Sequence, residues 1–246
     1  MSKIGGVILA AGKGTRMNST TVNKVALPLA GKPMIVHALD LLESLNVDPV
    51  IIVVGFAKES VMSKVTKKVI YAEQLERLGT AHAVETALVQ LPEGVENILV
   101  IQGDDSAFYE EEALRKMIDV HLSNNNGLTF LTVELSNPTG LGRVVRDEEG
   151  KVLKIVEEKD ATDEIREVKE INAACYVLNV SFLRKYLPFV EKSPVTGEYY
   201  LVSLIEVAQK NKEKFEAIKG GLVSWRGVNT PEELLEAEKL YKKVNS

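Results

Sequence analysis

The chain has 246 residues, of which 45% are hydrophobic and 26% charged, and this composition excludes a disordered, collagen-like or coiled-coil protein. The formal net charge of −5 argues against a protein that follows a nucleic-acid backbone. The most apolar stretch, 49–57, has about half of the roughly 20 residues that a membrane span needs, and the N-terminal segment is too short for a signal peptide. The single cysteine, Cys175, excludes an internal disulfide, so we expect a cytoplasmic protein without nucleic-acid or membrane partners.

The first half of the chain alternates short β-branched runs with amphipathic stretches, which is typical of α/β winding. Buried strands are predicted at 7–10, 50–54, 69–71 and 98–101. Helices are predicted at 33–45, 58–67, 80–91 and 110–122. All four helices fit crossovers between parallel strands.

The second half of the chain begins with closely spaced strands. They are predicted at 128–133, 143–146, 152–156 and 171–178, and a turn at 147–150 joins two of them as a hairpin. Helices follow at 181–187, 198–209 and 231–242. Because no linker or internal repeat divides the sequence, we predict a single domain over 1–246. It has a nucleotide-binding lobe at about 1–125 and a second lobe at about 126–246 that completes the site.

The segment LAAGKGTRM at residues 9–17 directly follows a predicted buried strand. Ligands of open α/β sheets bind at such strand ends, and glycines let backbone N–H groups approach a phosphate closely. The segment therefore predicts a phosphate-binding loop made of Leu9, Ala10, Ala11, Gly12, Lys13, Gly14 and Thr15, with Arg16 beside it. It lacks the Gly-Lys-Ser/Thr of a Walker A loop, and Met17 replaces the third glycine of a dinucleotide loop. A glycine-rich turn with solvated basic side chains is the alternative.

Together with Lys24 and the AGKPM of 30–34, this segment resembles the sugar-nucleotide pyrophosphorylases. The resemblance is strongest to the uridylyltransferase domain of the bacterial N-acetylglucosamine-1-phosphate uridylyltransferases. Further blocks occur in the family's order: QLERLGTAHA (74–83), GD (103–104), GLGR (140–143), IVEEKDA (155–161), EIN (170–172), GEYY (197–200) and GVN (227–229). The resemblance implies a three-layer, Rossmann-like α/β fold with a mixed, mostly parallel central sheet.

The resemblance also implies a metal-assisted transfer between two substrates. A phosphate oxygen of a sugar 1-phosphate attacks the α-phosphorus of a nucleoside triphosphate, and pyrophosphate leaves. Arg16 and Lys24 are the implied catalytic residues, because they would hold the triphosphate and the charge that develops on it. Asp104 and Asn229 are the implied ligands of Mg²⁺, which prefers hard oxygen donors.

The substrate contacts implied by the resemblance fall into two groups. The nucleotide would be bound by the glycine loop together with Gln74, Gly79 and Thr80. Because a glutamine amide can flip, Gln74 alone does not separate uracil from cytosine. The sugar would be bound by Gly142, Glu157, Asn172 and Tyr200.

The chain departs from the family's patterns mainly around the expected sugar site. Tyr-Gly-Asp-Val-Pro-Leu becomes QGDDSA at 102–107, Asn-Thr-Gly becomes NAA at 172–174, and Thr-Asp becomes VS at 202–203. Asn23 stands where the family has a proline before Lys24. From its type alone, the new Asp105 is expected to face solvent.

We therefore predict a sugar-1-phosphate nucleotidyltransferase with UTP as the expected nucleotide and N-acetylglucosamine 1-phosphate or glucose 1-phosphate as the sugar. One alternative is a thymidylyl- or cytidylyltransferase that acts on another sugar or alcohol phosphate, and another is a non-catalytic regulatory subunit that binds a nucleotide sugar. No hexapeptide repeats of the family's acetyltransferase half occur, so acetyl transfer is not expected of this chain. His37, His82 and His121 are expected to lie on helix surfaces or in packing, and Cys175 to be buried.

Overall fold

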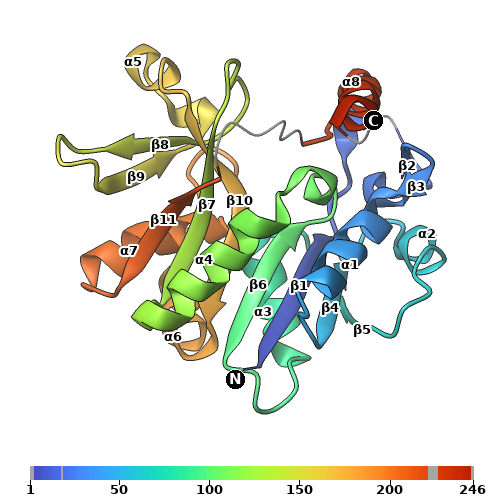
Figure 1. Cartoon of the computed structure of the whole chain (residues 1–246), viewed down its shortest axis with the longest axis horizontal. Helices are drawn as coiled ribbons and strands as arrows, with labels where there is room; N and C mark the ends of the chain where they lie inside the picture. Colours follow the sequence, from blue (N-terminus) through green and yellow to red (C-terminus); the bar gives the residue numbers. More distant parts are fainter. Residues whose placement is uncertain (1–2, 18, 221–226, 245–246) are drawn as a thin grey trace.

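The computed structural model describes residues 3–17, 19–220 and 227–244. Within them, the main sheet has nine strands (Figure 1). Seven form the path β11-β7-β10-β6-β1-β4-β5, and β8 and β9 form a hairpin beside β10. In chain order the nine strands are β1 (Ile4–Ala10), β4 (Val50–Val54), β5 (Ile70–Glu73), β6 (Asn97–Gln102), β7 (Leu128–Glu134), β8 (Arg143–Arg146), β9 (Val152–Val156), β10 (Glu170–Asn179) and β11 (Phe215–Lys219).

The central sheet is mixed and mostly parallel, as predicted. β1 lies parallel between β4 and β6, so that Val7 pairs with Ile51 on one side and with Val100 on the other. β10 runs antiparallel to both of its neighbours on the path, β6 and β7. The parallel strands therefore place their carboxyl ends along one edge of the sheet.

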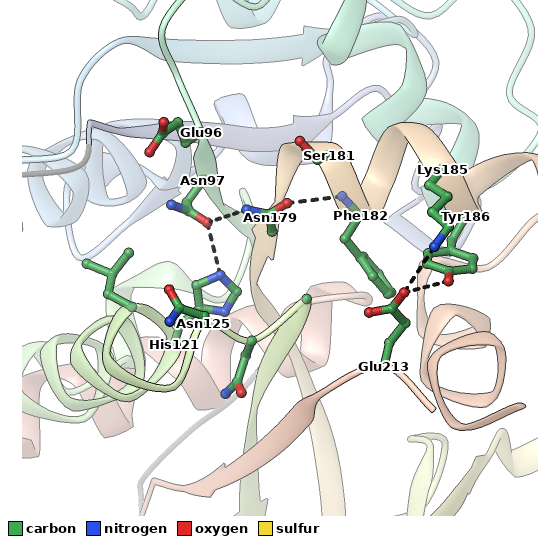
Figure 2. A pocket seen from close by; sticks show the side chains of 13 residues that line it. Glu96, Asn97, His121, Asn125, Asn179, Ser181, Phe182, Lys185, Tyr186 and Glu213 are labelled. Atoms are coloured by element: carbon green, nitrogen blue, oxygen red, sulfur yellow. Dashed lines mark hydrogen bonds and ion pairs between the residues drawn. The ribbon is translucent and has the colours of Figure 1, made fainter. Parts of the chain in front are cut away.

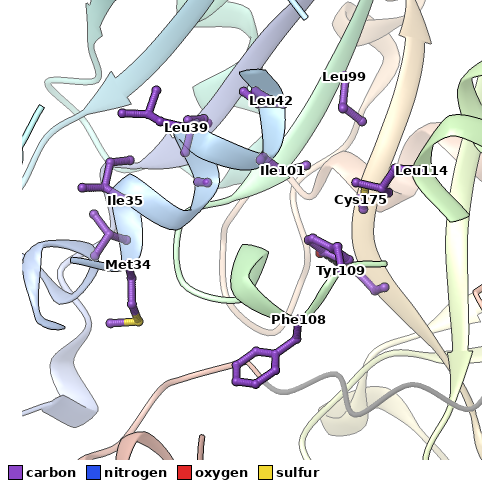
Figure 3. Close-up of a cluster of buried hydrophobic side chains, with 14 of the residues drawn as sticks. Met34, Ile35, Leu39, Leu42, Leu99, Ile101, Phe108, Tyr109, Leu114 and Cys175 are labelled. Atoms are coloured by element: carbon purple, nitrogen blue, oxygen red, sulfur yellow. Dashed lines mark hydrogen bonds between the residues drawn. The ribbon is translucent and has the colours of Figure 1, made fainter. Parts of the chain in front are cut away.

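Helices cover both faces of this sheet and make the three-layer arrangement. α1 (Met34–Ser44) and α4 (Glu111–Asn124) pack on one face, and α3 (Thr80–Val89), α6 (Val180–Tyr186) and α7 (Leu204–Lys210) on the other. α8 (Pro231–Val244) joins the cluster of the first face through Ala237. Ile8 and Ala10 join the first hydrophobic cluster, whereas Val7 and Leu9 join the second, because side chains alternate along a strand. Figure 3 shows the first cluster, where Cys175 is buried beside Leu114 as expected.

The remaining elements are short. They are α2 (Lys58–Met62), α5 (Asp163–Arg166), the hairpin of β2 (Pro28–Leu29) and β3 (Lys32–Pro33), and the 3-10 helices η1 (Thr15–Met17), η2 (Lys24–Ala26), η3 (Ser106–Phe108), η4 (Glu158–Asp160), η5 (Leu187–Phe189) and η6 (Leu201–Ser203). None of the helices in the described residues combines the length and the apolar character that crossing a bilayer requires.

Two predicted helices need correction, and one strand of the main sheet was missed. The helix predicted at 198–209 is α-helical only in α7, because the backbone of Tyr199 instead bonds to Leu78 and Ala81. The helix predicted at 58–67 ends at Met62, before the β-branched Val65 and Thr66, which disfavour helix. β11 was not predicted at all.

A buried polar network lies at the opposite edge of the sheet from the carboxyl ends of the parallel strands. It lines a cavity of about 560 Å³ (Figure 2). The Nε2–H of His121 donates to Asn97 Oδ1 at 3.1 Å, and Asn179 Nδ2 donates to the same oxygen at 3.3 Å. Nδ1 of His121 lies 3.0 Å from the hydroxyl of Thr129, which also accepts from Asn126 Nδ2. Both ring nitrogens thus have partners, and His121 is a satisfied packing residue.

This histidine gives the fold an acid-sensitive component. Burial lowers the pKa of His121 from 6.5 to about 4, so its contribution to stability is complete above pH 6.5 and is lost as the pH falls through 4. Between pH 7.5 and pH 5 we expect the free energy of unfolding to fall by about 2 kcal/mol more in the wild type than in H121Q. Urea titrations at the two pH values measure this difference. Equal acid sensitivity in both proteins would contradict the assignment.

Candidate active site

Two cavities at the carboxyl edge of the sheet share a wall. The first, of about 530 Å³, is lined by the loop after β1 and by Gln74 and Gly79. The second, of about 320 Å³, is lined by Gly142, Glu157, Asn172 and Tyr200. Five residues line both cavities: Lys24, Thr80, Gln102, Asp104 and Asn229. The fold thus gathers the predicted nucleotide, metal and sugar residues in one place, except that the side chain of Thr15 lies outside the described part of the chain.

Asn23 fastens the glycine loop to the sheet. Its side chain is 1% exposed, and its Nδ2 lies within 3.2 Å of the carbonyl oxygens of Ala10, Gly12 and Phe56. Its backbone N–H donates to Ser60 Oγ at 2.9 Å, which a proline at this position could not do. The asparagine that replaces the family's proline therefore stabilises the glycine loop through hydrogen bonds that its residue type alone did not predict.

The loop itself needs glycine where it turns. Gly14 has φ +57°, in the left-handed region, and an added Cβ would lie 3.3 Å from the Cβ of Lys24. Arg16 is exposed at the cavity and forms no hydrogen bond or ion pair with another described residue, so its guanidinium is available to a ligand. Lys13 lies over the ring of Phe56 at 5.9 Å.

Gln74 is held in one orientation, contrary to the expectation that its amide can flip freely. Its Nε2 lies 3.1 Å from the carbonyl oxygen of Gly79 and 3.0 Å from His82 Nδ1. A carbonyl oxygen can only accept, so the nitrogen must face Gly79 and the oxygen is the amide atom left for a base.

Gly79 lies where the segment that lines the first cavity packs against the backbone of Tyr199. It has φ +110°, and an added Cβ would lie 2.4 Å from the carbonyl oxygen of Tyr199, so no other residue fits. That oxygen accepts from the N–H of Ala81 at 2.9 Å, and the N–H of Tyr199 donates to Leu78 at 2.7 Å. The segment that carries Tyr200 is thereby fixed against the segment that carries Gln74.

The wall between the cavities is built around one ammonium group. Lys24 Nζ lies 2.7 Å from Asp104 Oδ2 and 3.1 Å from Asn229 Oδ1. The side chains of Lys24 and Asp104 are only 15% and 14% exposed, so this ion pair is less screened by solvent than a surface pair. Lys24 comes from η2, Asp104 follows β6 and Asn229 precedes α8, so three distant segments meet here.

The donor set of this wall fits a hard divalent cation. A carboxylate and an amide oxygen already converge on one positive charge, and both are ligand types that Mg²⁺ accepts. Across 3–17, 19–220 and 227–244, no group of three or more His, Cys, Asp or Glu residues is placed to hold a metal. A cation here would therefore take its other ligands from water and substrate phosphates, as Mg²⁺ commonly does.

Asp105 is buried, which corrects the expectation that it faces solvent. Asp105 is 3% exposed, and its Oδ1 has no hydrogen-bond partner among the described residues. Burial, reinforced by the charge of Asp104, raises the pKa of Asp105 well above its usual range. The hydroxyl of Tyr109 lies 3.0 Å from Asp105 Oδ2 and 2.6 Å from the carbonyl oxygen of Ala173.

In the second cavity, Gly142 leaves room for a carboxylate. An added Cβ at residue 142 would lie 3.0 Å from Glu157 Oε1. No described residue donates a hydrogen bond to the carboxylate of Glu157, and burial raises its pKa. Its two oxygens can therefore accept from hydroxyl groups of a ligand.

Two of the three small or apolar replacements near the expected sugar site line this cavity, and one does not. Ala174 and Val202 are part of its wall, whereas Ala173 is fully buried in the cluster on the other face of the sheet. Ala174 has φ +52°, a conformation that costs a non-glycine residue about 1–2 kcal/mol. Such strain is concentrated at functional sites.

Known proteins resemble this chain over nearly its whole length. A family model described as nucleotidyl transferase matches residues 5–244. The bifunctional protein GlmU of Thermoanaerobacter pseudethanolicus is 39% identical over 237 residues, which cover 96% of this chain and 51% of that protein. GlmU of Geobacillus sp. is 41% identical over 237 residues, which again cover 96% of this chain and 51% of that protein. The chain therefore spans about half the length of these curated relatives.

A solved structure from Bacillus anthracis has the same fold. That protein, described as a glucose-1-phosphate thymidylyltransferase in complex with a sucrose, superposes with a TM-score of 0.82 over 99% of this chain and 97% of its own. Its sequence is 21% identical, so the likeness concerns the fold alone.

Proposed function

This chain belongs to the nucleotidyl transferase family, and we propose that it transfers a uridylyl group from UTP to a hexose 1-phosphate and releases pyrophosphate. The observation that carries the proposal is the pair of adjoining cavities whose common wall holds Lys24, Asp104 and Asn229. A reaction between two phosphate esters needs this arrangement, because their reacting phosphates must meet where positive charge is held. The lobe of residues 1–125 would bind the nucleotide and that of 126–246 the sugar.

In this mechanism a phosphate oxygen of the hexose 1-phosphate bonds to the α-phosphorus. The bond from the α-phosphorus to the bridging oxygen breaks, and pyrophosphate leaves with its electron pair. The nucleophile is already an anion, so no general base is required. When bound, the divalent cation supplies positive charge next to the phosphate oxygens. Lys24 and Arg16 bind the triphosphate and neutralise charge on the departing pyrophosphate.

The nucleotide base would sit in the first cavity against Gln74. The fixed Gln74 Oε1 is an acceptor, which suits the N3–H of uracil or thymine. Cytosine also carries a donor, on its exocyclic nitrogen, so a thymidylyl- or cytidylyltransferase remains the alternative within the same reaction. A purely binding role is disfavoured, because a regulatory subunit does not need the group of Lys24, Asp104 and Asn229 between the cavities.

The hexose need not carry an N-acetyl group. Ala174 and Val202 give the second cavity an apolar wall, and apolar contact with a methyl group discriminates by only about 10- to 200-fold. We expect glucose 1-phosphate to be used with a kcat/KM equal to or above that of N-acetylglucosamine 1-phosphate.

Pyrophosphate release across four nucleoside triphosphates and several sugar 1-phosphates tests both assignments. The expected best pair contains UTP and a hexose 1-phosphate. A preference for the acetylated sugar above about 100-fold would contradict the sugar assignment, and faster release with CTP would contradict the choice of base.

A further inference from the structure

We propose that Tyr176 contacts the hexose: its phenol hydroxyl donates a hydrogen bond into the second cavity and holds Asn172 in the orientation that binds the sugar. The inference rests on the proposed function, because it takes this cavity to be the hexose subsite. The sequence predicts Tyr176 only as part of the buried strand 171–178. The structure instead makes it part of the cavity wall.

An irregularity in β10 brings the two side chains together. In a regular strand, residues four apart are separated by about 13 Å along the chain. Here the register shifts between Asn172 and Tyr176, and Ala174 between them adopts a left-handed φ of +52°. The result is a distance of 2.6 Å between Asn172 Nδ2 and the Tyr176 hydroxyl oxygen.

The backbone fixes the direction of this hydrogen bond. Asn172 Oδ1 accepts from the N–H of Ala174 at 3.1 Å, and a backbone N–H can only donate. The amide nitrogen of Asn172 must therefore face Tyr176, whose oxygen accepts. The hydroxyl hydrogen of Tyr176 is left without an acceptor among the described residues.

That hydrogen stays in place at neutral pH. Tyr176 is 3% exposed, and its burial, reinforced by the charge of Glu157, raises the pKa of the phenol against the opposing effect of the Asn172 hydrogen bond. A donor that faces a cavity is available to an acceptor group of a ligand, which replaces the water bound there.

The neighbouring Glu157 offers the complementary function. Its carboxylate has no partner among the described residues and lines the same cavity. A sugar hydroxyl both donates and accepts, so one ring substituent can donate to Glu157 while it accepts from Tyr176. This pattern selects a hydroxyl over a substituent that can do only one of the two.

The test compares Y176F with Y186F. Tyr186 is also buried and also loses a hydroxyl in its variant, but that hydroxyl donates to Glu213 Oε1 beside the cavity of Figure 2. In Y176F the KM for the sugar 1-phosphate should rise about 10-fold, the loss expected when one buried hydrogen bond is removed. Its kcat should fall less than 3-fold, and the KM for the nucleotide should stay within 2-fold. Y186F should match the wild type in all three.

Sugar 1-phosphates that lack single hydroxyls separate contact from a merely structural role. For one of them the penalty seen in the wild type should shrink at least 5-fold in Y176F, because the variant no longer has the donor. An equal penalty at every position in both proteins would overturn the inference, as would an unchanged KM in Y176F. If the wild type itself releases no pyrophosphate with any pair, the proposed function fails instead. Calorimetric titration with the sugar 1-phosphates then still compares wild type and Y176F, and equal affinity would overturn the contact.

Discussion

Replacing Lys24 with methionine is expected to lower kcat at least 100-fold and to weaken nucleotide binding, while the KM for the sugar 1-phosphate stays within 2-fold. The reason is the place of its ammonium, at the wall between the cavities and 2.7 Å from Asp104 Oδ2. Removing one preorganised charged or hydrogen-bonding partner of a transition state costs about 10²- to 10³-fold in turnover. Arg16→Ala should behave similarly, because Arg16 lines the first cavity and not the second. Initial rates at varied concentrations of each substrate separate these effects.

A matched lysine and a binding measurement control this prediction. Lys32 forms a surface ion pair with Asp40 at 2.8 Å and lines neither cavity, so Lys32→Met removes the same charge outside the site and should leave the rates unchanged. Mn²⁺ should bind K24M at least as tightly as the wild type, since the ammonium competes with a cation for Asp104. A K24M protein with normal kcat and impaired sugar affinity would show that Lys24 binds the sugar phosphate and not the triphosphate.

Replacing Asp104 with asparagine is expected to remove at least 2–3 kcal/mol of transition-state stabilisation, or about a 50-fold loss in kcat/KM at saturating Mg²⁺. The substitution keeps the shape of the side chain but removes the carboxylate charge that converges with Asn229 Oδ1 on one positive charge. Mn²⁺ affinity, measured without substrates, should fall in parallel, because an amide is a weaker ligand than a carboxylate.

The exposed Asp119 on α4 is the matched control for this substitution. Asp119→Asn should retain the activity and the Mn²⁺ affinity of the wild type. A folded D104N protein that turns over within a few-fold of the wild type would show that Asp104 is not the metal ligand.

The sequence predicted the fold best where burial and local pattern agree. The strands 50–54, 143–146 and 152–156 begin and end at the predicted residues, because β-branched runs there are bounded by turns. β11 was missed because the short sequence FEAIK lacks both a β-branched run and a regular alternation, and it lies at an edge where its pairing with β7 decides the structure. The family read from ordered motifs is confirmed by the match over residues 5–244.

The residues of the candidate site could be predicted from the sequence, but the contacts between them could not. Motifs placed Asp104 and Lys24 in the site, yet their ion pair joins residues 80 positions apart and depends on the whole sheet. Asn23 and Asp105 are surface residue types by composition, and only their packing shows that they are buried. The period of two places Tyr176 on the same strand face as Asn172, but only the irregularity in β10 brings the two side chains into contact.

The most direct test of the account follows the phosphorus atoms. In ³¹P NMR of the wild type with UTP, glucose 1-phosphate and Mg²⁺, the signals of the triphosphate and the sugar phosphate should decline together. Pyrophosphate and the two phosphorus atoms of a nucleoside diphosphate sugar should appear in equal amounts, and only when both substrates are present. Consumption of the triphosphate to nucleoside diphosphate and phosphate regardless of the sugar, or stable binding without any conversion across the substrate grid, would contradict nucleotidyl transfer at this site.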